Sequence, residues 1–363
     1  MKILISVDAV TGGAGNVAQI LALHYAKRGE EVYLMFYHKK TTDSRYDLNK
    51  IHIIEQKKFN TTIPLINSVF HLNKLINEIS PSIIISFLNT ISPPILLSQL
   101  ATKIPIIVSE RSDPYNNTPH FKNKLLRYIS YKRANLITVQ FDVFKLFDKA
   151  AFRKGKVITI PNMILSPQKT KDYSYKTDII CFATIATLYS VKRLELMIEL
   201  FSLINKRCPN TKLNIYGKGV DESKLKDLII KKDLGNFVFL NGFINNVYDH
   251  LSENDIYLMT SIREGFPNSL SEAMAVGLPS VSFKCHEGLS ELIQHNVNGY
   301  LIEEGDYDNF CEIAIQLVNN FSLRKQIGEM AALSVKKYGY DKIMKMWDTY
   351  VYSICLKNCN SSE

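Results

Sequence analysis

Two carboxylates lie close together in the stretch Arg263 to Pro279, which reads REGFPNSLSEAMAVGLP. Glu264 and Glu272 are separated there by seven residues, and Ser269 lies between them at the start of a run of good helix formers. The amino end of a helix offers unpaired amides and the positive end of the helix dipole, so it favours an anion such as a pyrophosphate. The stretch therefore has the groups of an anion site.

The flanking residues predict how this site is positioned. Asp255 to Thr260 and Ser280 to Phe283 have strand character, so the helix between them is the crossover of two parallel strands. The helix is predicted to begin near Ser269 and to end at Gly277, a suitable C-terminal cap with Pro279 just beyond it. In an open parallel sheet, ligands bind where a strand ends and the next helix begins.

A simpler explanation exists for one of the carboxylates. Ser269 and Glu272 also form an S-x-x-E capping box, in which Glu272 only caps its own helix. The sequence leaves both interpretations of Glu272 open. Glu264 lies before the helix and has no such explanation.

The segment EGFPNSLSEAMAVGLP resembles the signature of glycosyltransferase family 4, the retaining GT-B enzymes, and weaker resemblance extends over the whole chain. The resemblance implies an α/β GT-B fold, in which two Rossmann-like domains face a central cleft. It also implies that Glu272 binds the ribose of a nucleotide-sugar donor and that Glu264 binds the sugar hydroxyls or the reacting face. The same nucleotide-sugar site would include Phe266 and the phosphate-binding amides of Asn268, Ser269 and Leu270.

Two basic residues, Lys192 and Arg193, come near the amino end of a helix predicted over Val191 to Asn205. Cations there oppose the helix dipole, so either a bound anion or plain exposure to solvent explains the placement. By the resemblance, Lys192 binds the diphosphate. Family members usually carry an arginine five positions earlier, where this chain has Thr187. Either Lys192 and the later helix end suffice, or Arg193 or Arg263 substitutes, or activity is reduced.

A glycine turn follows the first predicted strand. Gly13-x-Gly15-x-x-Ala18 satisfies a dinucleotide fingerprint, but the second strand lacks the following acid that would bind an NAD ribose. By the resemblance, Gly13 belongs to a glycine pair that lets the backbone approach the donor phosphates and the acceptor. Gly15 departs from the family, where an acidic or polar residue is common.

Two further turns resemble parts of the nucleotide pocket. Gly217 lies in the sequence YGKG after a predicted strand, which resembles the family's G-x-G loop lining that pocket; the alternative is a simple tight turn. Gly242 and Phe243 resemble the family's turn beside the nucleobase.

A charged segment, Ser109 to Pro114, ends a strand in the first half of the chain. It resembles an S-E-R-x-D-P motif of bacterial polysaccharide transferases in this family, which faces the cleft where acceptor meets donor. By the resemblance, Glu110, Arg111 and Asp113 are acceptor-side residues. The alternative is a salt bridge between Arg111 and Asp113 that braces a turn.

Strand-like and helical runs alternate twice along the chain, as in two doubly wound α/β domains. We predict an N-terminal acceptor-side domain over residues 1–163, a linker over 164–177, a C-terminal nucleotide-sugar-binding domain over 178–340, and a helix over 341–363 that returns to the first domain. In the first half, a helix is predicted over Val17–Lys27 and strands over Ile3–Val7, Glu31–Phe36, Ile83–Phe87, Ile104–Ser109, Ile137–Gln140 and Val157–Ile160.

Composition fits a soluble protein of two ordinary domains. The chain has 363 residues, of which 46% are hydrophobic and 22% charged. Its six cysteines lack metal-ligand spacing and predict reduced cytosolic thiols. The first residues do not form a signal peptide, and no apolar run of about 20 residues is present, so we expect a cytoplasmic protein.

Positive charge is concentrated in the first half of the chain. Residues 1–170 carry 23 basic and 11 acidic residues, whereas residues 171–363 carry 21 and 24. Between Phe121 and Lys156, ten basic residues face only two acids, and Leu125, Tyr128 and Ile129 recur at helical spacing. This pattern suits an interfacial helix on anionic lipid, although a solvated basic face and a core stripe are the alternatives. No nucleic-acid-binding motif is recognisable.

These patterns and the resemblance lead to one hypothesis. We expect a hexosyl- or N-acetylhexosaminyltransferase that moves a sugar, with retention, from a nucleotide-sugar such as a UDP-sugar to a lipid-linked oligosaccharide. The product would be a bacterial O-antigen of lipopolysaccharide, a capsule or an exopolysaccharide, made at the inner face of the cell membrane without a metal cofactor. The alternatives are a sugar-nucleotide epimerase of the same fold and a non-catalytic basic membrane-binding module.

Overall fold

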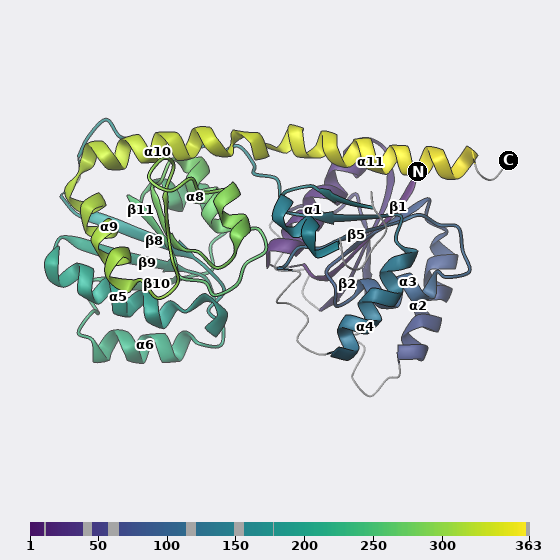
Figure 1. Ribbon diagram of the computed structural model, residues 1–363, viewed down its shortest axis with the longest axis horizontal. Helices are drawn as coiled ribbons and strands as arrows, with labels where there is room; N and C mark the ends of the chain where they lie inside the picture. Colours follow the sequence, from purple (N-terminus) through teal and green to yellow (C-terminus); the bar gives the residue numbers. More distant parts are fainter. Residues whose placement is uncertain are drawn as a thin grey trace. The chain divides into compact units, whose positions relative to one another are not determined.

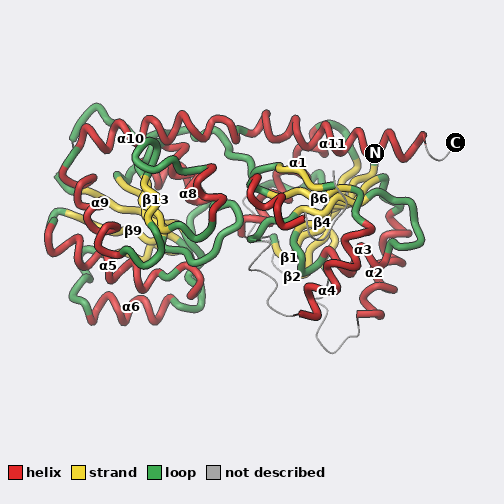
Figure 2. Tube along the Cα trace, viewed as in Figure 1, coloured by secondary structure: helices red, strands yellow, loops and turns green. Residues whose placement is uncertain are grey.

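The computed structural model describes residues 1–10, 12–38, 46–56, 65–113, 121–148, 156–176 and 178–360. The chain divides into two compact units, each built on one parallel sheet with helices (Figure 1). Unit 1 comprises Met1–Met163 together with Asp341–Glu363, and unit 2 comprises Ile164–Tyr340. In Figure 2 the strands of each unit form a separate central layer.

The sheet of unit 1 has the strand order β3-β2-β1-β4-β5-β6-β7 within the described residues. Its strands are β1 (Lys2–Ala9), β2 (Glu31–His38), β3 (His52–Glu55), β4 (Ile83–Phe87), β5 (Ile106–Ser109), β6 (Leu136–Val139) and β7 (Val157–Thr159). Neighbouring strands pair in parallel. Every residue of β4 is buried, as expected for a central strand that is covered on both faces.

Helices cover both faces of this sheet (Figure 1). They are α1 (Gly12–Lys27), α2 (Leu65–Ile79), α3 (Ser92–Ser98), α4 (Phe121–Ser130), η2 (Tyr131–Arg133), η3 (Asp142–Asp148) and α11 (Tyr340–Asn360). Side chains of α2, α3 and η2 share one core cluster with the strands. On α1 and α11, His24 and Asp348 form a hydrogen bond of 3.0 Å, and Trp347 of α11 is fully buried. The C-terminal helix therefore packs in unit 1, as the GT-B prediction requires.

The sheet of unit 2 has the strand order β10-β9-β8-β11-β12-β13 within the described residues. Its strands are β8 (Ile180–Ile185), β9 (Thr211–Tyr216), β10 (Val238–Gly242), β11 (Ile256–Met259), β12 (Ser280–Phe283) and β13 (Tyr300–Ile302). Chain order reverses between β8 and β11, which are neighbours in the sheet although three elements of chain order apart. The carboxyl ends of such a pair form the switch point at which open parallel sheets bind ligands.

The helices of unit 2 lie in two groups. They are η4 (Ser190–Lys192), α5 (Leu194–Arg207), α6 (Glu222–Lys231), α7 (Val247–Ser252), α8 (Asn268–Val276), η5 (Glu287–Glu291), α9 (Tyr307–Asn319), α10 (Phe321–Val335) and η6 (Lys336–Tyr338). Side chains of α5, α6 and α9 share one core cluster with the strands, whereas α8 packs against α7 and α10. The predicted crossover is confirmed, because α8 joins the parallel strands β11 and β12 and ends at Gly277 with a left-handed φ of 96°.

The predicted linker over residues 164–177 is part of unit 2 where it is described; residue 177 lies outside the described residues. The amide of Lys171 donates to the carbonyl of Val276 at 2.9 Å, and its ammonium lies 2.9 Å from a carboxylate oxygen of Asp255. The hydroxyl of Tyr173 donates to the carbonyl of Gly277 at 2.9 Å. These bonds fasten the segment to α8 and β11, which the irregular sequence did not predict.

Candidate functional site

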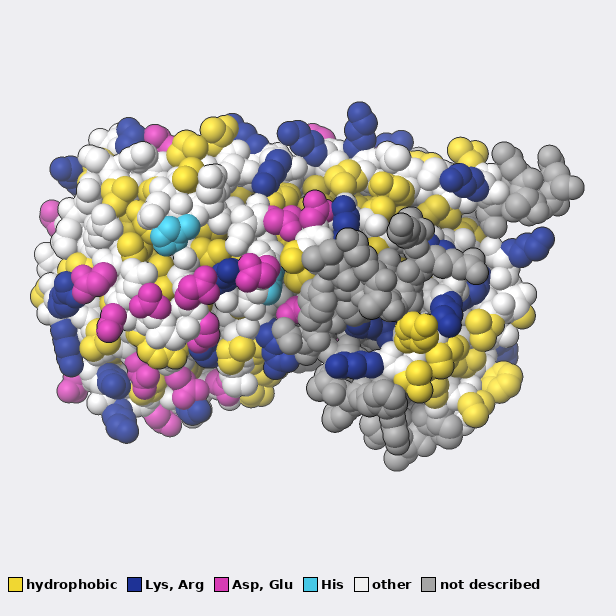
Figure 3. Space-filling model, viewed as in Figure 1, with side chains coloured by type: hydrophobic (Ala, Val, Ile, Leu, Met, Phe, Trp, Pro, Cys, Tyr) yellow, Lys and Arg dark blue, Asp and Glu magenta, His cyan; other side chains and the backbone are white. Residues whose placement is uncertain are grey.

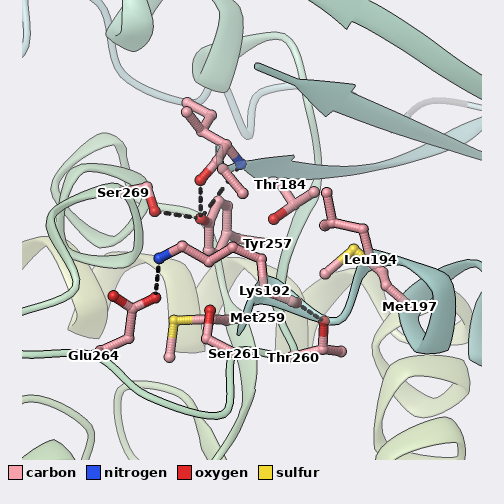
Figure 4. A pocket seen from close by; sticks show the side chains of 12 residues that line it. Thr184, Lys192, Leu194, Met197, Tyr257, Met259, Thr260, Ser261, Glu264 and Ser269 are labelled. Atoms are coloured by element: carbon pink, nitrogen blue, oxygen red, sulfur yellow. Dashed lines mark hydrogen bonds and ion pairs between the residues drawn. The ribbon is translucent and has the colours of Figure 1, made fainter. Parts of the chain in front are cut away.

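A pocket lies at the switch point of unit 2, where β8 and β11 end (Figure 4). Its walls come from the end of β8, the turn at η4, the end of β11 and the first turn of α8. The lining residues are Thr184, Ile185, Ala186, Lys192, Leu194, Met197, Tyr257, Met259, Thr260, Ser261, Glu264 and Ser269. The pocket thus occupies the position that the sequence predicted for an anion site.

Lys192 and Glu264 meet inside this pocket. The Nζ atom of Lys192 lies 2.5 Å from Oε1 of Glu264, and their side chains are 20% and 14% exposed. The sequence assigned the first residue to a diphosphate and the second to sugar hydroxyls, and the structure joins them as an ion pair. An ammonium has three donors, so one contact with a carboxylate leaves Lys192 able to bind a second anion.

Arg193 fixes the turn that carries Lys192. Its φ of 48° and ψ of 45° are left-handed, which is unfavourable for a residue with a side chain and persists only where the surroundings impose it. The Nε of Arg193 donates to the carbonyl of Thr260 at 2.8 Å, and the hydroxyl of Thr260 donates to the carbonyl of Lys192 at 2.9 Å. These bonds hold the turn against the end of β11.

The helix predicted over Val191 to Asn205 is wrong at its start, because the left-handed residue divides it into η4 and α5. The guanidinium of Arg193 pairs with both carboxylate oxygens of Glu304 and lies 5.4 Å from the ring of Phe283. It does not line the pocket. The suggestion that Arg193 substitutes for the arginine replaced by Thr187 is therefore wrong.

The first turn of α8 brings Ser269 to the pocket. The helix begins at Asn268, and its N-cap residue Pro267 makes no side-chain capping bond. The Ser269 hydroxyl instead accepts a hydrogen bond of 2.8 Å from Tyr257. A capping box with Glu272 is therefore not what begins this helix. The amides of the first turn have no carbonyl partner within the helix and can bind an anion.

Tyr257 is a pocket residue that the sequence reasoning missed. Its side chain is fully buried in β11, and burial raises the pKa of its phenol to about 12. In Figure 4 the hydroxyl lies beside Ser269. The available signal was a phenol inside the apolar run of β11, because a buried hydroxyl needs a hydrogen-bond partner.

Other predicted donor-site residues lie outside the pocket lining. Phe266 is buried with its ring 5.3 Å from that of Tyr338, and Leu270 is fully buried in unit 2. Glu272 is half-buried one turn along α8. Phe243 is 44% exposed after β10. The structure therefore joins Lys192, Glu264 and Ser269, and it leaves the roles of the others as predictions.

Gly217 allows two loops to cross behind the pocket wall. A Cβ atom added there would lie 1.8 Å from the carbonyl oxygen of Ala186, and the φ of Gly217 is 145°. A Cβ atom at Gly219 would lie 2.3 Å from the carbonyl oxygen of Leu188. The loop after β9 thus needs both glycines to pass the loop after β8, which lines the pocket.

In unit 1 the predicted glycine turn is the first turn of α1. The helix begins at Gly12 rather than near Val17, so Gly13 is its second residue and is exposed. A Cβ atom at Gly15 would lie 2.3 Å from the carbonyl oxygen of Val10. This close approach explains why a glycine replaces the acidic or polar residue that is common in the family.

Arg111 lies in the interior of unit 1, which contradicts the prediction of a cleft-facing acceptor residue. Its Nε donates to Oγ of Ser109 at 2.7 Å, and a terminal nitrogen donates to the carbonyl of Ile160 at 2.9 Å. The guanidinium also lies 5.5 Å from the centre of the Trp347 ring. Burial lowers the pKa of Arg111 to about 9. The side chain therefore ties the ends of β5 and β7 to α11.

Glu110 and Asp113 are also buried rather than open to an acceptor. Glu110 accepts a hydrogen bond from the hydroxyl of Tyr131. Burial raises the pKa of the Glu110 carboxyl, and the charge of Arg127 acts in the opposite direction. Pro114, the last residue of the motif, lies outside the described residues. Sequence alone could not show that strand ends this polar would be covered.

Metal ligands and membrane spans were sought among the described residues. No group of three His, Cys, Asp or Glu side chains there could hold a metal ion. Within the same ranges, no helix is long and apolar enough to cross a membrane. The cysteines described as free are Cys181, Cys208, Cys285, Cys311 and Cys355.

Comparison with known proteins connects the pocket with a family. Residues 168–333, which include every residue that lines the pocket, match the model of the family described as glycosyl transferases group 1. The chain belongs to this family. The resemblance inferred from the stretch between Arg263 and Pro279 is thus confirmed.

Curated relatives match this group 1 glycosyl transferase over parts of their length. An uncharacterized glycosyltransferase of Haemophilus influenzae is 29% identical over 231 residues, which cover 62% of this chain and 64% of the relative. A poly(ribitol-phosphate) alpha-N-acetylglucosaminyltransferase of Staphylococcus aureus is 28% identical over 303 residues, which cover 81% of this chain and 60% of the relative. The chain thus spans less than two thirds of the length of either relative.

Solved structures match this glycosyl transferase over almost its whole length. HepE of Anabaena, in complex with UDP and glucose, has a TM-score of 0.81 at 18% identity and covers 97% of this chain and 100% of that chain. TarM of S. aureus, in complex with fondaparinux, alpha-GlcNAc-glycerol and UDP, has a TM-score of 0.78 at 17% identity and covers 98% and 99%. This likeness confirms the GT-B fold.

Proposed function

We propose that this chain is a retaining glycosyltransferase that moves a sugar from a UDP-sugar to a lipid-linked oligosaccharide in bacterial cell-surface polysaccharide synthesis. The observation that carries the proposal is the pocket at the switch point of unit 2, where Lys192 and the first turn of α8 can bind an anion beside Glu264. The UDP in the HepE and TarM structures supports the choice of donor. The S. aureus relative, named for poly(ribitol-phosphate), supports a cell-surface acceptor.

The transfer breaks the bond between the sugar C1 and a diphosphate oxygen and forms a bond between C1 and an acceptor oxygen. The proton of the acceptor hydroxyl leaves on the departing diphosphate, which gains negative charge. Groups already aimed at such charge lower the barrier most effectively. We assign this role to Lys192 and the amides of Ser269 and Leu270, without a metal ion. We assign Glu264 to the hydroxyls of the sugar and Glu272 to the donor ribose.

Titration calorimetry with UDP, GDP and ADP, followed by turnover assays, tests the proposal. We expect UDP to bind and a UDP-sugar to give a glycosylated lipid acceptor with the same anomeric configuration, equally well in EDTA. Glu264→Gln should bind UDP but transfer the sugar slowly. Nucleotide and epimerised sugar released without an acceptor would indicate an epimerase instead. Binding without turnover would indicate a non-catalytic module.

The proposal places the enzyme on the cytoplasmic face of the membrane, and an exposed apolar layer of unit 1 supports this. On α4, Leu125 is 46% exposed and Ile129 52% exposed; on α2, Ile66 is 64% exposed and Phe70 69% exposed. Both helices contact α3, so they belong to one layer. Figure 3 shows hydrophobic side chains gathered in the region of these helices, with Lys and Arg side chains among them.

The charge of this layer selects anionic lipid as its partner. Residues 121–133, which form α4 and η2, include five basic residues and no acidic residue. The ammonium of Lys132 lies 4.6 Å from the centre of the Tyr128 ring. Exposed apolar side chains beside basic ones are the pattern of an interfacial helix on anionic headgroups. The stripe predicted at helical spacing is therefore open to solvent at these positions rather than core.

Vesicle co-sedimentation tests this surface. We expect the protein to bind vesicles that contain phosphatidylglycerol and not vesicles of phosphatidylcholine alone. The double variant Leu125→Ser with Ile129→Ser should release most of the protein, whereas Ile230→Ser on the exposed face of α6 should not. Equal binding by both variants would contradict the assignment of this surface.

A further inference from the structure

A row of hydrogen bonds crosses three elements beside the pocket. The amide of Ile185, at the end of β8, donates to the hydroxyl oxygen of Tyr257 at 3.4 Å. The hydroxyl of Tyr257, on β11, donates to Oγ of Ser269 at 2.8 Å. Ser269 is the second residue of α8. Figure 4 shows the Tyr257 hydroxyl between the end of β8 and the side chain of Ser269.

The direction of these bonds determines what Ser269 can do. A hydroxyl has one hydrogen to donate, and Tyr257 gives its hydrogen to Ser269. Ser269 therefore accepts on that side, and its own hydrogen remains for another acceptor. Among the described residues, Oγ of Ser269 has no hydrogen-bond partner besides Tyr257. The hydrogen is thus available to an acceptor that enters the pocket.

Burial keeps this arrangement fixed at neutral pH. The Tyr257 side chain is fully buried, which raises the pKa of its phenol to about 12, and the negative charge of Glu264 also raises it. The phenol therefore stays protonated and remains a donor. A hydrogen bond that is shielded from water and polarised by a second one is stronger than an isolated bond in water.

We propose that Tyr257 is a positioning residue that makes the Ser269 hydroxyl a fixed donor to a diphosphate oxygen in the pocket. The acceptor must be an anion, because the neighbouring pocket groups are the ammonium of Lys192 and the amides at the start of α8. Tyr257 itself does not touch the ligand. The inference rests on the proposed function, since it assumes that a nucleoside diphosphate occupies this pocket.

A double-mutant cycle tests the inference. Titration calorimetry compares UDP with uridine, which lacks the diphosphate, on the native chain, Tyr257→Phe, Ser269→Ala and the double variant. We expect Tyr257→Phe to weaken UDP binding about 5- to 10-fold, the effect of one lost hydrogen bond. Uridine affinity should not change, and the double variant should bind UDP no more weakly than Ser269→Ala. Tyr300→Phe, which alters a buried tyrosine of β13, should bind like the native chain.

The failures of the two proposals can be told apart. If the native chain binds none of UDP, GDP and ADP, the proposed function fails, and the inference fails with it before any variant is compared. If UDP binds but Tyr257→Phe causes the same loss with and without Ser269, Tyr257 only supports packing and the inference is overturned. An equal loss for UDP and uridine overturns it as well. Thermal unfolding of each variant confirms that the fold is retained.

Discussion

Replacing Lys192 with methionine keeps the aliphatic stem and removes the ammonium that pairs with Glu264. The two side chains are 20% and 14% exposed, so water screens the pair only in part. Two unit charges about 4 Å apart attract by about 4 kcal/mol at an effective dielectric of about 20, and desolvation offsets much of this. We expect Lys192→Met to lower the free energy of unfolding of unit 2 by about 1–2 kcal/mol, because the carboxylate of Glu264 loses its partner.

A double variant separates this stability effect from ligand binding. Lys192→Met with Glu264→Gln removes both charges, so most of the lost stability should return. UDP affinity should stay about 10- to 100-fold lower in both variants, since a hydrogen bond to a charged group contributes about 1.5–3 kcal/mol. Urea denaturation followed by circular dichroism measures the stability, and titration calorimetry measures the affinity. If the double variant regains UDP affinity together with stability, Lys192 only neutralises Glu264 and its assignment to the diphosphate is refuted.

Three further substitutions test the supporting structure. Gly217→Ala should lower the free energy of unfolding of unit 2 by about 2–3 kcal/mol or more in urea denaturation, because the new Cβ would meet the Ala186 carbonyl, whereas Gly235→Ala has open space and should have little effect. Trp347→Ala should lower that of unit 1 by about 3–5 kcal/mol, and scanning calorimetry should show the transition of unit 2 unchanged. Burial raises the pKa of Glu110, so folded protein keeps a proton that unfolded protein releases, and stability should fall as pH rises from about 4 through the raised pKa. Glu110→Gln should remove this fall in urea denaturation across pH 4 to 7, and an unchanged slope would contradict the reasoning.

Local patterns were sufficient for the strands that are apolar throughout and for the central crossover. β4 and β12 have the bounds that the sequence predicted, because each is a short buried run between turn residues. Gly277 was predictable as the end of α8, since a left-handed cap favours glycine. β3 and β13 were not predicted: β3 is the half-polar run HIIE, and β13 has only three residues. Their pairing depends on neighbouring strands rather than on local pattern.

Side-chain partners that are distant in sequence were beyond sequence reasoning. Lys192 and Glu264 were each assigned to the site, but their ion pair depends on the turn at Arg193, whose left-handed backbone is held by Thr260 and Glu304. The burial of Arg111 depends on α11, which begins more than 200 residues later in the chain. A charged motif at a strand end therefore indicated a surface site where the structure has an interior one.

A crystal structure of this chain with the nucleoside diphosphate that calorimetry selects would test the central claim most directly. The account predicts the terminal phosphate in the pocket between β8 and β11, with its oxygens within hydrogen-bond distance of Nζ of Lys192, the hydroxyl of Ser269 and the first amides of α8. A nucleotide bound elsewhere, with the Lys192–Glu264 pair closed and Ser269 without a phosphate contact, would contradict it.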